Sequence, residues 1–157
     1  VPGTNGAQFS PQGGARLSLK GLETLALLFL GDGSVGEVRL LSPESMTELR
    51  RLVWRYDPER QNLDDYDGTL NAWAAGIRII TSETEGDRLF AGDERTWFGH
   101  FGEAYGLLAG VWADPETGDA VIYALTGSAF DPYADEGPTS TLTPIEARIL
   151  AQLGRLL

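Results

Sequence analysis

The sequence predicts an α+β domain in which an antiparallel sheet carries helices packed on one face. Three observations lead to this prediction. Apolar residues at helical spacing dominate the first third of the chain, apolar β-prone segments joined by a turn follow in the second half, and a capped helix closes the sequence. The 157 residues suit one domain, residues 1–157, and no internal repeat is visible.

The first third predicts two helices after an irregular lead-in over residues 1–15, which are rich in Gly, Pro, Asn and Gln. Ser18 is a candidate N-cap for the first helix, and a glycine-rich stop signal follows at 31–34. Its apolar face consists of Leu22, Leu25, Ala26 and Phe29. The second helix is expected after Ser42, with Pro43 at its first position. Its apolar stripe consists of Met46, Leu49 and Val53.

The middle of the chain predicts a surface loop and then a strand. Residues 57–69 contain a proline, a glycine and four aspartates, a composition typical of a surface loop. The β-prone segment 72–81 predicts one strand, and the polar segment 83–87 predicts a turn.

The last third predicts a hairpin and a terminal helix. Strands are expected at 107–113 and 120–125, because both segments are apolar and the residues between them form a typical hairpin connection. Thr143 and Glu146 form a capping box with Pro144 at the first helical position. The apolar face of this helix is expected to consist of Ile145, Ile149, Leu153 and Leu156.

Composition excludes several classes of partner. Acidic residues number 23 against 12 basic ones, and the formal charge of -11 repels phosphate backbones and anionic lipid, so no nucleic-acid partner is expected. No apolar run approaches the ~20 residues of a membrane-spanning helix, so no membrane span is expected. The absence of cysteine rules out disulfides and thiolate metal sites.

Three motifs follow one another along the chain. The segment Phe9–Ser18 leads into the first helix, which is followed by Leu40-Leu41-Ser42-Pro43. A Gly-His-x-Gly-x-x-x-Gly segment runs from Gly99 to Gly106, and a Trp-x-Asp-Pro-x-x-Gly segment runs from Trp112 to Gly118. In this order, the motifs resemble the C-terminal part of serine β-lactamase-like and penicillin-binding hydrolases, such as class C β-lactamases, DD-peptidases and esterases.

The resemblance implies part of a β-lactamase/transpeptidase-like fold and acyl transfer through a serine, on an ester, an amide or a β-lactam. In that family a Ser-x-x-Lys motif supplies the nucleophile and the base, a Tyr- or Ser-x-Asn motif assists proton transfer, and a Lys- or His-x-Gly motif lies on a strand. No cofactor is implied. Family members are often exported, so the resemblance favours a periplasmic or secreted location.

The resemblance carries site roles over to five residues. His100-Phe101-Gly102 matches the strand motif, so His100, Gly102 and Glu103 become the implied catalytic positions, with the Glu103 N–H as an oxyanion donor. Phe101 and Tyr105 are expected to line an apolar acyl pocket. Phe101 stands where Thr or Ser is usual, which favours an ester or amide substrate over a penicillin.

The other two catalytic motifs are missing from the chain. Lys20 is its only lysine and Leu17 stands where Ser-x-x-Lys needs serine, while no asparagine has Tyr or Ser two positions before it. We therefore expect a complementing upstream polypeptide of the same protein to carry the nucleophile, and the chain alone to be inactive. The alternative is a non-catalytic binding or interaction module that keeps the same sheet.

Metal binding has little support in the sequence. His100 is the only histidine and there is no cysteine, so a typical transition-metal site cannot be completed. The acidic segment 64–68 is similar to a calcium loop, but alignment on Gly68 puts Leu63 and Ala74 at the first and twelfth ligand positions. We interpret it as a solvated acidic loop, with weak Ca²⁺ binding as the alternative.

Overall fold

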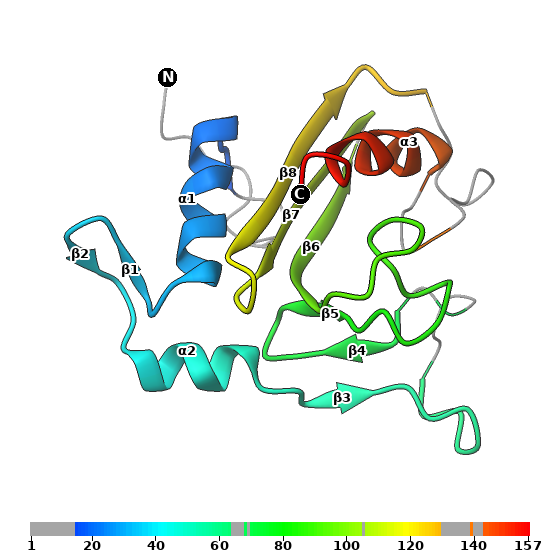
Figure 1. Cartoon of the computed structure of the whole chain (residues 1–157), viewed down its shortest axis with the longest axis horizontal. Helices are drawn as coiled ribbons and strands as arrows, with labels where there is room; N and C mark the ends of the chain where they lie inside the picture. The colour runs from blue at the N-terminus through cyan, green and yellow to red at the C-terminus, as the bar shows by residue number, and fades with distance from the viewer. Residues whose placement is uncertain (1–14, 64–67, 69, 105, 130–138, 140–142) are drawn as a thin grey trace.

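The centre of the fold is an antiparallel sheet with helices around it (Figure 1). The computed structural model describes residues 15–63, 68, 70–104, 106–129, 139 and 143–157. Among these residues the sheet has six strands in the order β3-β4-β5-β6-β7-β8, each antiparallel to its neighbour. The predicted α+β class with an antiparallel sheet is therefore confirmed.

The sheet has a short half and a long half. The strands are β3 (Trp54–Arg55), β4 (Ala72–Trp73), β5 (Arg78–Ile80), β6 (Trp97–Ala104), β7 (Leu107–Asp114) and β8 (Asp119–Thr126). The last three have eight residues each and extend well past β3, β4 and β5, as Figure 1 shows. The predicted hairpin is confirmed as β7 and β8, in register from Leu107↔Thr126 to Asp114↔Asp119.

Each of the three described helices begins at the predicted cap. They are α1 (Leu19–Leu30), α2 (Pro43–Arg50) and α3 (Pro144–Leu153). Ser18, Ser42 and Thr143 each accept a hydrogen bond from the backbone N–H three residues later, at 3.2, 3.1 and 3.4 Å. These bonds satisfy N–H groups that the first helical turn leaves without a partner. In the described part of the chain, no helix combines the length and the apolar character needed to cross a membrane.

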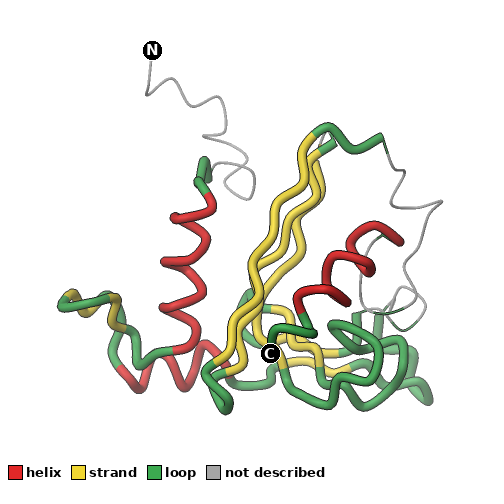
Figure 2. The backbone as a smooth tube through the Cα atoms, turned by 45° about the horizontal axis from the view of Figure 1, so that its top comes forward, coloured by secondary structure: helices red, strands yellow, loops and turns green. Residues whose placement is uncertain are grey.

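The helices lie on both faces of the sheet, so the prediction that they pack on one face is wrong. Figure 2 shows α1 and α3 on opposite sides of the long strands. Under α3, Leu150 packs in a core with Trp97, Trp112 and Tyr123. On the other face, Phe29 of α1 and Leu49 of α2 pack against a second cluster, which consists of Ala72, Ala74, Ile77 and Ile79. The physical reason is visible along β7, where consecutive residues 111–114 are buried, so that both faces need cover.

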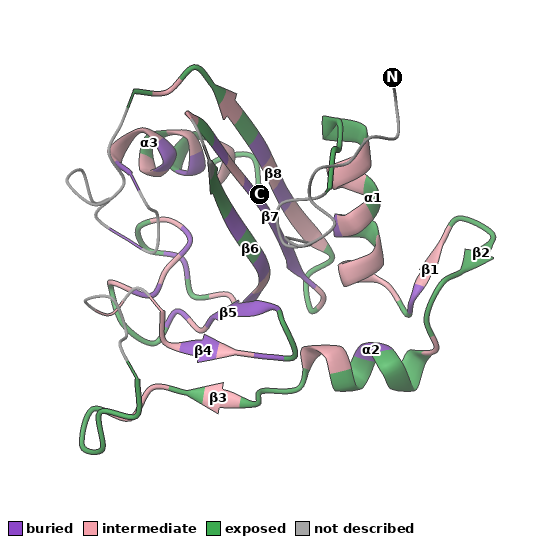
Figure 3. Cartoon of the chain, turned by 180° about the vertical axis from the view of Figure 1, so that it is seen from behind, coloured by how far each residue is buried: buried purple, intermediate pink, exposed green. Residues whose placement is uncertain are grey.

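Turns account for two differences from the sequence prediction. The predicted strand at 72–81 is two strands, because Gly76 adopts a φ of +76° and the Ala74 N–H donates to the Ile77 carbonyl at 2.8 Å. A further hairpin, β1 (Ser34–Val35) with β2 (Val38–Arg39), follows α1 where only a turn was expected. Figure 3 shows β2 and most of α2 as exposed and β1 as intermediate, in contrast to the buried strand β5.

The apolar stripes of two helices need correction at their C-terminal ends. Helix α2 ends at Arg50, and Val53 lies beyond it with 56% of its surface exposed. Helix α3 ends at Leu153, so Leu156 is 82% exposed, while the fully buried positions of the helix are Glu146 and Leu150. Both predicted stripes continue past the last helical residue, because hydrophobic periodicity alone does not show where a helix ends.

Candidate functional site

The predicted catalytic residues lie together on strand β6. His100, Gly102 and Glu103 are all exposed, and they pair with Val111, Ala109 and Leu108 of β7 in regular register. Tyr105 lies outside the described residues, so its predicted role stays a prediction. The segment 100–104 is the part of the structure on which the acyl-transfer interpretation depends.

This segment has a strand on one side only, as far as the described residues extend. Strand β5 pairs with β6 at Trp97, Phe98 and Gly99 and continues no further along it. In an antiparallel ladder, successive backbone N–H and C=O groups point alternately to the two sides of the strand. Residues 100–104 therefore direct part of their backbone groups away from β7, toward an edge where an extended ligand can pair.

The two glycines of the segment have different roles. At Gly99 an added Cβ would meet the Val111 carbonyl oxygen, and it would come within 2.9 Å of the Trp112 side chain, so packing requires glycine there. At Gly102 the nearest atoms to an added Cβ belong to Ala109, at 4.0 Å. Packing therefore does not require glycine at Gly102. The absence of a side chain there lets a ligand approach the backbone closely.

The geometry around His100 fixes which ring nitrogen carries a proton. Its Nδ1 lies 2.5 Å from the Phe101 carbonyl oxygen, and because a carbonyl can only accept, Nδ1 must be the donor. In the neutral ring, Nε2 then holds the lone pair. The imidazole also packs edge-on against Trp73, with ring centroids 5.4 Å apart. The ring is therefore oriented by two contacts while the residue stays exposed.

Phe101 is part of the core. Only 8% of its surface is exposed, and its ring lies edge-on to Trp112 at a centroid distance of 4.7 Å. The Arg78 guanidinium lies 5.1 Å from the same ring and 5.8 Å from the Trp112 ring. Burial lowers the pKa of Arg78 to about 10, against the opposing effect of Asp87, so Arg78 stays charged at neutral pH. These contacts account for Phe101 as a packing residue, and its contact with substrate stays a prediction.

A buried polar cluster lies beneath the start of α3, next to the core. The Tyr123 hydroxyl donates to Glu146 Oε1 at 2.7 Å, and the Thr143 hydroxyl donates to Glu146 Oε2 at 3.0 Å. Burial raises the pKa of Glu146, and the charge of Glu103 adds to this increase, while the two hydroxyl bonds oppose it. Burial and the adjacent Glu146 raise the pKa of Tyr123, so it remains a donor. The sequence identified Glu146 only as a capping residue, and no local signal marks its partner Tyr123.

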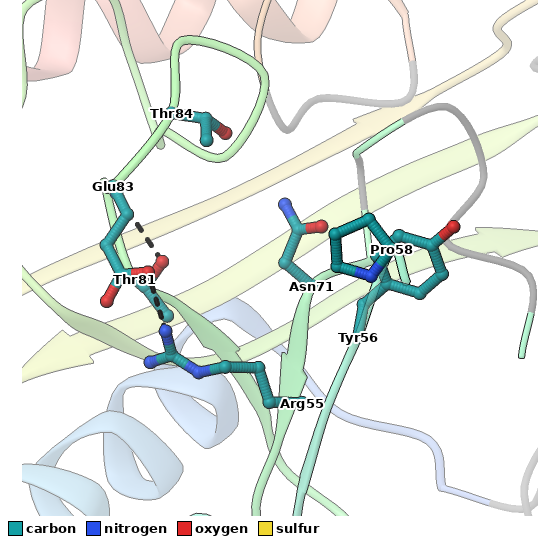
Figure 4. A pocket seen from close by; sticks show the side chains of 7 residues that line it. All are labelled: Arg55, Tyr56, Pro58, Asn71, Thr81, Glu83 and Thr84. Atoms are coloured by element: carbon teal, nitrogen blue, oxygen red, sulfur yellow. Dashed lines mark hydrogen bonds and ion pairs between the residues drawn. The ribbon is translucent and has the colours of Figure 1, made fainter. Parts of the chain in front are cut away.

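A cavity of about 240 Å³ lies at the end of the short strands (Figure 4). The β5–β6 register places it away from segment 100–104. Its lining residues come from β3, the residues flanking β4 and β5, and the loops that follow β3 and β5: Arg55, Tyr56, Pro58, Asn71, Thr81, Glu83 and Thr84. Sequence reasoning missed this site entirely. No local sequence motif predicts this cavity, because its lining residues come together only when the strands pair.

Comparison with known proteins adds no family to these observations. No family model, no curated protein and no solved structure matches the chain.

Among the described residues, no group of three or more His, Asp or Glu side chains is placed to hold a metal ion. The acidic residues 64–67, on which the calcium alternative rests, lie outside the described part of the chain, so that alternative stays a prediction.

Proposed function

We propose that this chain is the sheet-bearing part of a serine hydrolase that acts by acyl transfer on an ester, an amide or a β-lactam. The observation that carries the proposal is the position of the His-x-Gly segment. The three motif residues that the resemblance implies as catalytic, His100, Gly102 and Glu103, are exposed on the half of β6 that β5 leaves unpaired. A backbone edge of this kind supplies N–H donors for a substrate carbonyl.

The proposed chemistry needs a serine nucleophile with its lysine base, and the chain has no Ser-x-x-Lys motif to supply the pair. A serine Oγ attacks the substrate carbonyl carbon, a base takes the hydroxyl proton, and the leaving group departs with a proton as the acyl-enzyme forms. In the second step, water attacks the carbonyl carbon of the acyl-enzyme after the base takes a proton from it. The serine oxygen leaves with that proton, and the carboxylic acid is released. With Lys20 as the only lysine and no Ser-x-x-Lys motif, the serine and its base belong to a complementing upstream polypeptide. Segment 100–104 contributes the oxyanion side of the cleft.

Exposed apolar side chains are consistent with such a complement. Six of them lie before and on α1 and around the β1–β2 hairpin, each between 37% and 60% exposed: Leu17, Leu19, Leu27, Val38, Leu40 and Leu41. Apolar side chains that stay exposed are candidates for cover by another polypeptide. On the described residues, β8 also pairs with β7 alone, which leaves a second strand edge for the complement.

The first test is complementation. We expect the purified chain alone to hydrolyse neither nitrocefin nor p-nitrophenyl acetate above background. Addition of the upstream polypeptide of the same reading frame is expected to give turnover of at least one of them. Turnover by the isolated chain that disappears when one of its own serines is mutated would contradict the proposal.

Substitution of Gly102 tests the cleft itself in the complemented protein. Gly102→Val places a branched side chain at the proposed point of substrate approach, where the nearest atoms to an added Cβ are those of Ala109, at 4.0 Å. We expect kcat/KM to fall by roughly 10–100-fold. Ala124→Val is the matched control, because Ala124 is an exposed β8 residue in the same cross-strand row as Gly102 and Ala109. Equal effects of the two variants would exclude a cleft at Gly102.

The alternative function is a non-catalytic module that binds a ligand or a partner through the same sheet. The burial of Phe101 favours it, because this position carries no hydroxyl and its ring is occupied by Trp112 and Arg78. A complemented protein that binds p-nitrophenyl acetate analogues without turnover would select the alternative.

A further inference from the structure

The cavity at the end of the short strands is separate from the proposed acyl-transfer cleft. Strand register places it there: β5 runs from Arg78, opposite Gly99, to Ile80, opposite Trp97, and Thr81 follows on the side away from His100. All of its lining residues belong to the described part of the chain. The cavity is therefore a second site, and its own side chains determine which ligand it can bind.

Hydrogen bonds hold the cavity wall in a fixed shape. The Tyr56 N–H donates to the Asn71 carbonyl at 2.9 Å and so extends the β3–β4 pairing. The N–H and hydroxyl of Thr81 both donate to the buried carboxylate of Asp87, at 2.8 and 2.6 Å. The Asn62 side chain spans the first loop, where it donates to the Arg55 carbonyl and accepts from the Asp57 N–H. A preformed wall of this kind lowers the entropic cost of ligand binding.

The backbone between two wall residues is strained. Ser82 has a φ of +57°, in the left-handed region that non-glycine residues seldom adopt. Its buried hydroxyl donates to the Arg95 carbonyl at 2.6 Å, and this bond secures the conformation. Strain of this type recurs where a fold has to present particular side chains to a ligand. Here the adjacent residues are Thr81 and Glu83, both of which line the cavity.

The cavity presents a cation and an anion in direct contact. Arg55 Nη1 and Glu83 Oε2 are 2.6 Å apart, and both side chains are about half exposed, at 46% and 58%. Figure 4 shows this pair on one side of the Asn71 amide, with the rings of Tyr56 and Pro58 on the other. A guanidinium has five N–H donors and a carboxylate has about four lone-pair sites, so their mutual bond leaves capacity on both groups.

We propose that this cavity binds a free α-amino acid with an apolar side chain. In an α-amino acid the carboxylate and the ammonium are attached to one carbon, and this spacing matches a guanidinium and a carboxylate that touch. The ligand carboxylate binds Arg55, the ammonium binds Glu83, and the apolar side chain lies against Tyr56 and Pro58. The volume agrees, because about 240 Å³ is below the roughly 300–1,000 Å³ of pockets for drug-sized molecules.

The charge pair also determines what the cavity rejects. A simple anion meets the Glu83 carboxylate and a simple cation meets the Arg55 guanidinium, so a ligand with one charge gains one contact and suffers one repulsion. A peptide terminus carries one of the two charges only. The zwitterion is the class of small molecule that satisfies both partners.

Ligand titration followed by amide NMR tests the proposal on the 157-residue chain. L-leucine is expected to shift the backbone amides of cavity residues, Tyr56, Asn71, Thr81, Glu83 and Thr84, in a saturable manner. N-acetyl-L-leucine lacks the ammonium and L-leucinamide lacks the carboxylate, so each should bind at least about tenfold more weakly. Absence of shifts with L-leucine up to its solubility limit, or equal affinity for all three probes, would overturn the proposal.

Two variants connect binding to the charge pair. Arg55→Gln and Glu83→Gln are each expected to weaken L-leucine binding by about tenfold or more. Arg39→Gln is the matched control, because it breaks the exposed Arg39–Asp32 pair on the β1–β2 hairpin, whose 2.7 Å contact is similar. Retention of full affinity by both cavity variants would contradict the assignment. If circular dichroism shows that a cavity variant does not fold, the three-probe comparison on the unmodified chain decides the question.

Discussion

Tyr123→Phe removes one hydroxyl from the buried cluster beneath α3 and tests how that helix is held. The hydroxyl donates to Glu146 Oε1 at 2.7 Å, and Tyr123 and Glu146 are only 5% and 0% exposed, so water cannot replace the bond. Loss of a hydrogen bond to a charged acceptor costs about 1.5–3 kcal/mol, against about 1 kcal/mol for a neutral one. In a domain of this size, about 2 kcal/mol corresponds to a decrease in Tm of about 4–8 °C.

The effect of Tyr123→Phe should depend on pH in a defined direction. Burial raises the folded-state pKa of Glu146, so the contribution of this group to stability is fully present below its unfolded pKa of about 4.3. That contribution is lost as pH rises through the folded pKa. The Tyr123 bond lowers the pKa, which means that it favours the charged form. Its removal should therefore destabilise the protein more at pH 8 than at pH 4.5.

Thermal unfolding at the two pH values, followed by circular dichroism, measures this difference. Tyr56→Phe is the control, because Tyr56 is only partly buried and lies at the cavity of the short strands, away from the Glu146 cluster. In a Glu146→Gln background the pH dependence of the Tyr123→Phe effect should disappear, since glutamine does not ionise. A decrease in Tm that is the same at both pH values, or one that Tyr56→Phe reproduces, would refute the reasoning.

Three further substitutions test packing around the sheet. Gly110→Ala should cost about 1–3 kcal/mol in the free energy of unfolding measured by urea titration, because an added Cβ would come within 2.5–3.0 Å of the Tyr123 ring. Gly102→Ala on the neighbouring strand should change it by less than about 0.5 kcal/mol, and a larger loss there would contradict the open space around Gly102. Leu150→Ala should cost about 2–5 kcal/mol, because Leu150 is fully buried between α3 and the sheet. A cost below about 1 kcal/mol would mean that α3 is not firmly docked.

Local chemistry allowed several elements to be predicted from the sequence. The caps Ser18, Ser42 and Thr143 were identified because a side-chain oxygen and the N–H groups of the next turn are neighbours along the chain. The β7–β8 hairpin was identified because its turn residues, from Asp114 to Asp119, lie between two β-prone segments. Of the candidate site, only the residues of one short motif on one strand were predicted. His100, Gly102 and Glu103 share one strand, so sequence order alone placed them together.

The sequence by itself determined the helix starts, the long hairpin, the acidic charge and the lack of a Ser-x-x-Lys motif in this chain. Each of these depends on residues within a few positions of one another, or on composition. Only the tertiary structure decided that helices cover both faces of the sheet, that Phe101 lies in the core, and that Arg55 meets Glu83 at a cavity. Those outcomes depend on which strands pair and in which register. Contacts between residues distant in sequence carry no local signal, because they arise only when the chain has folded.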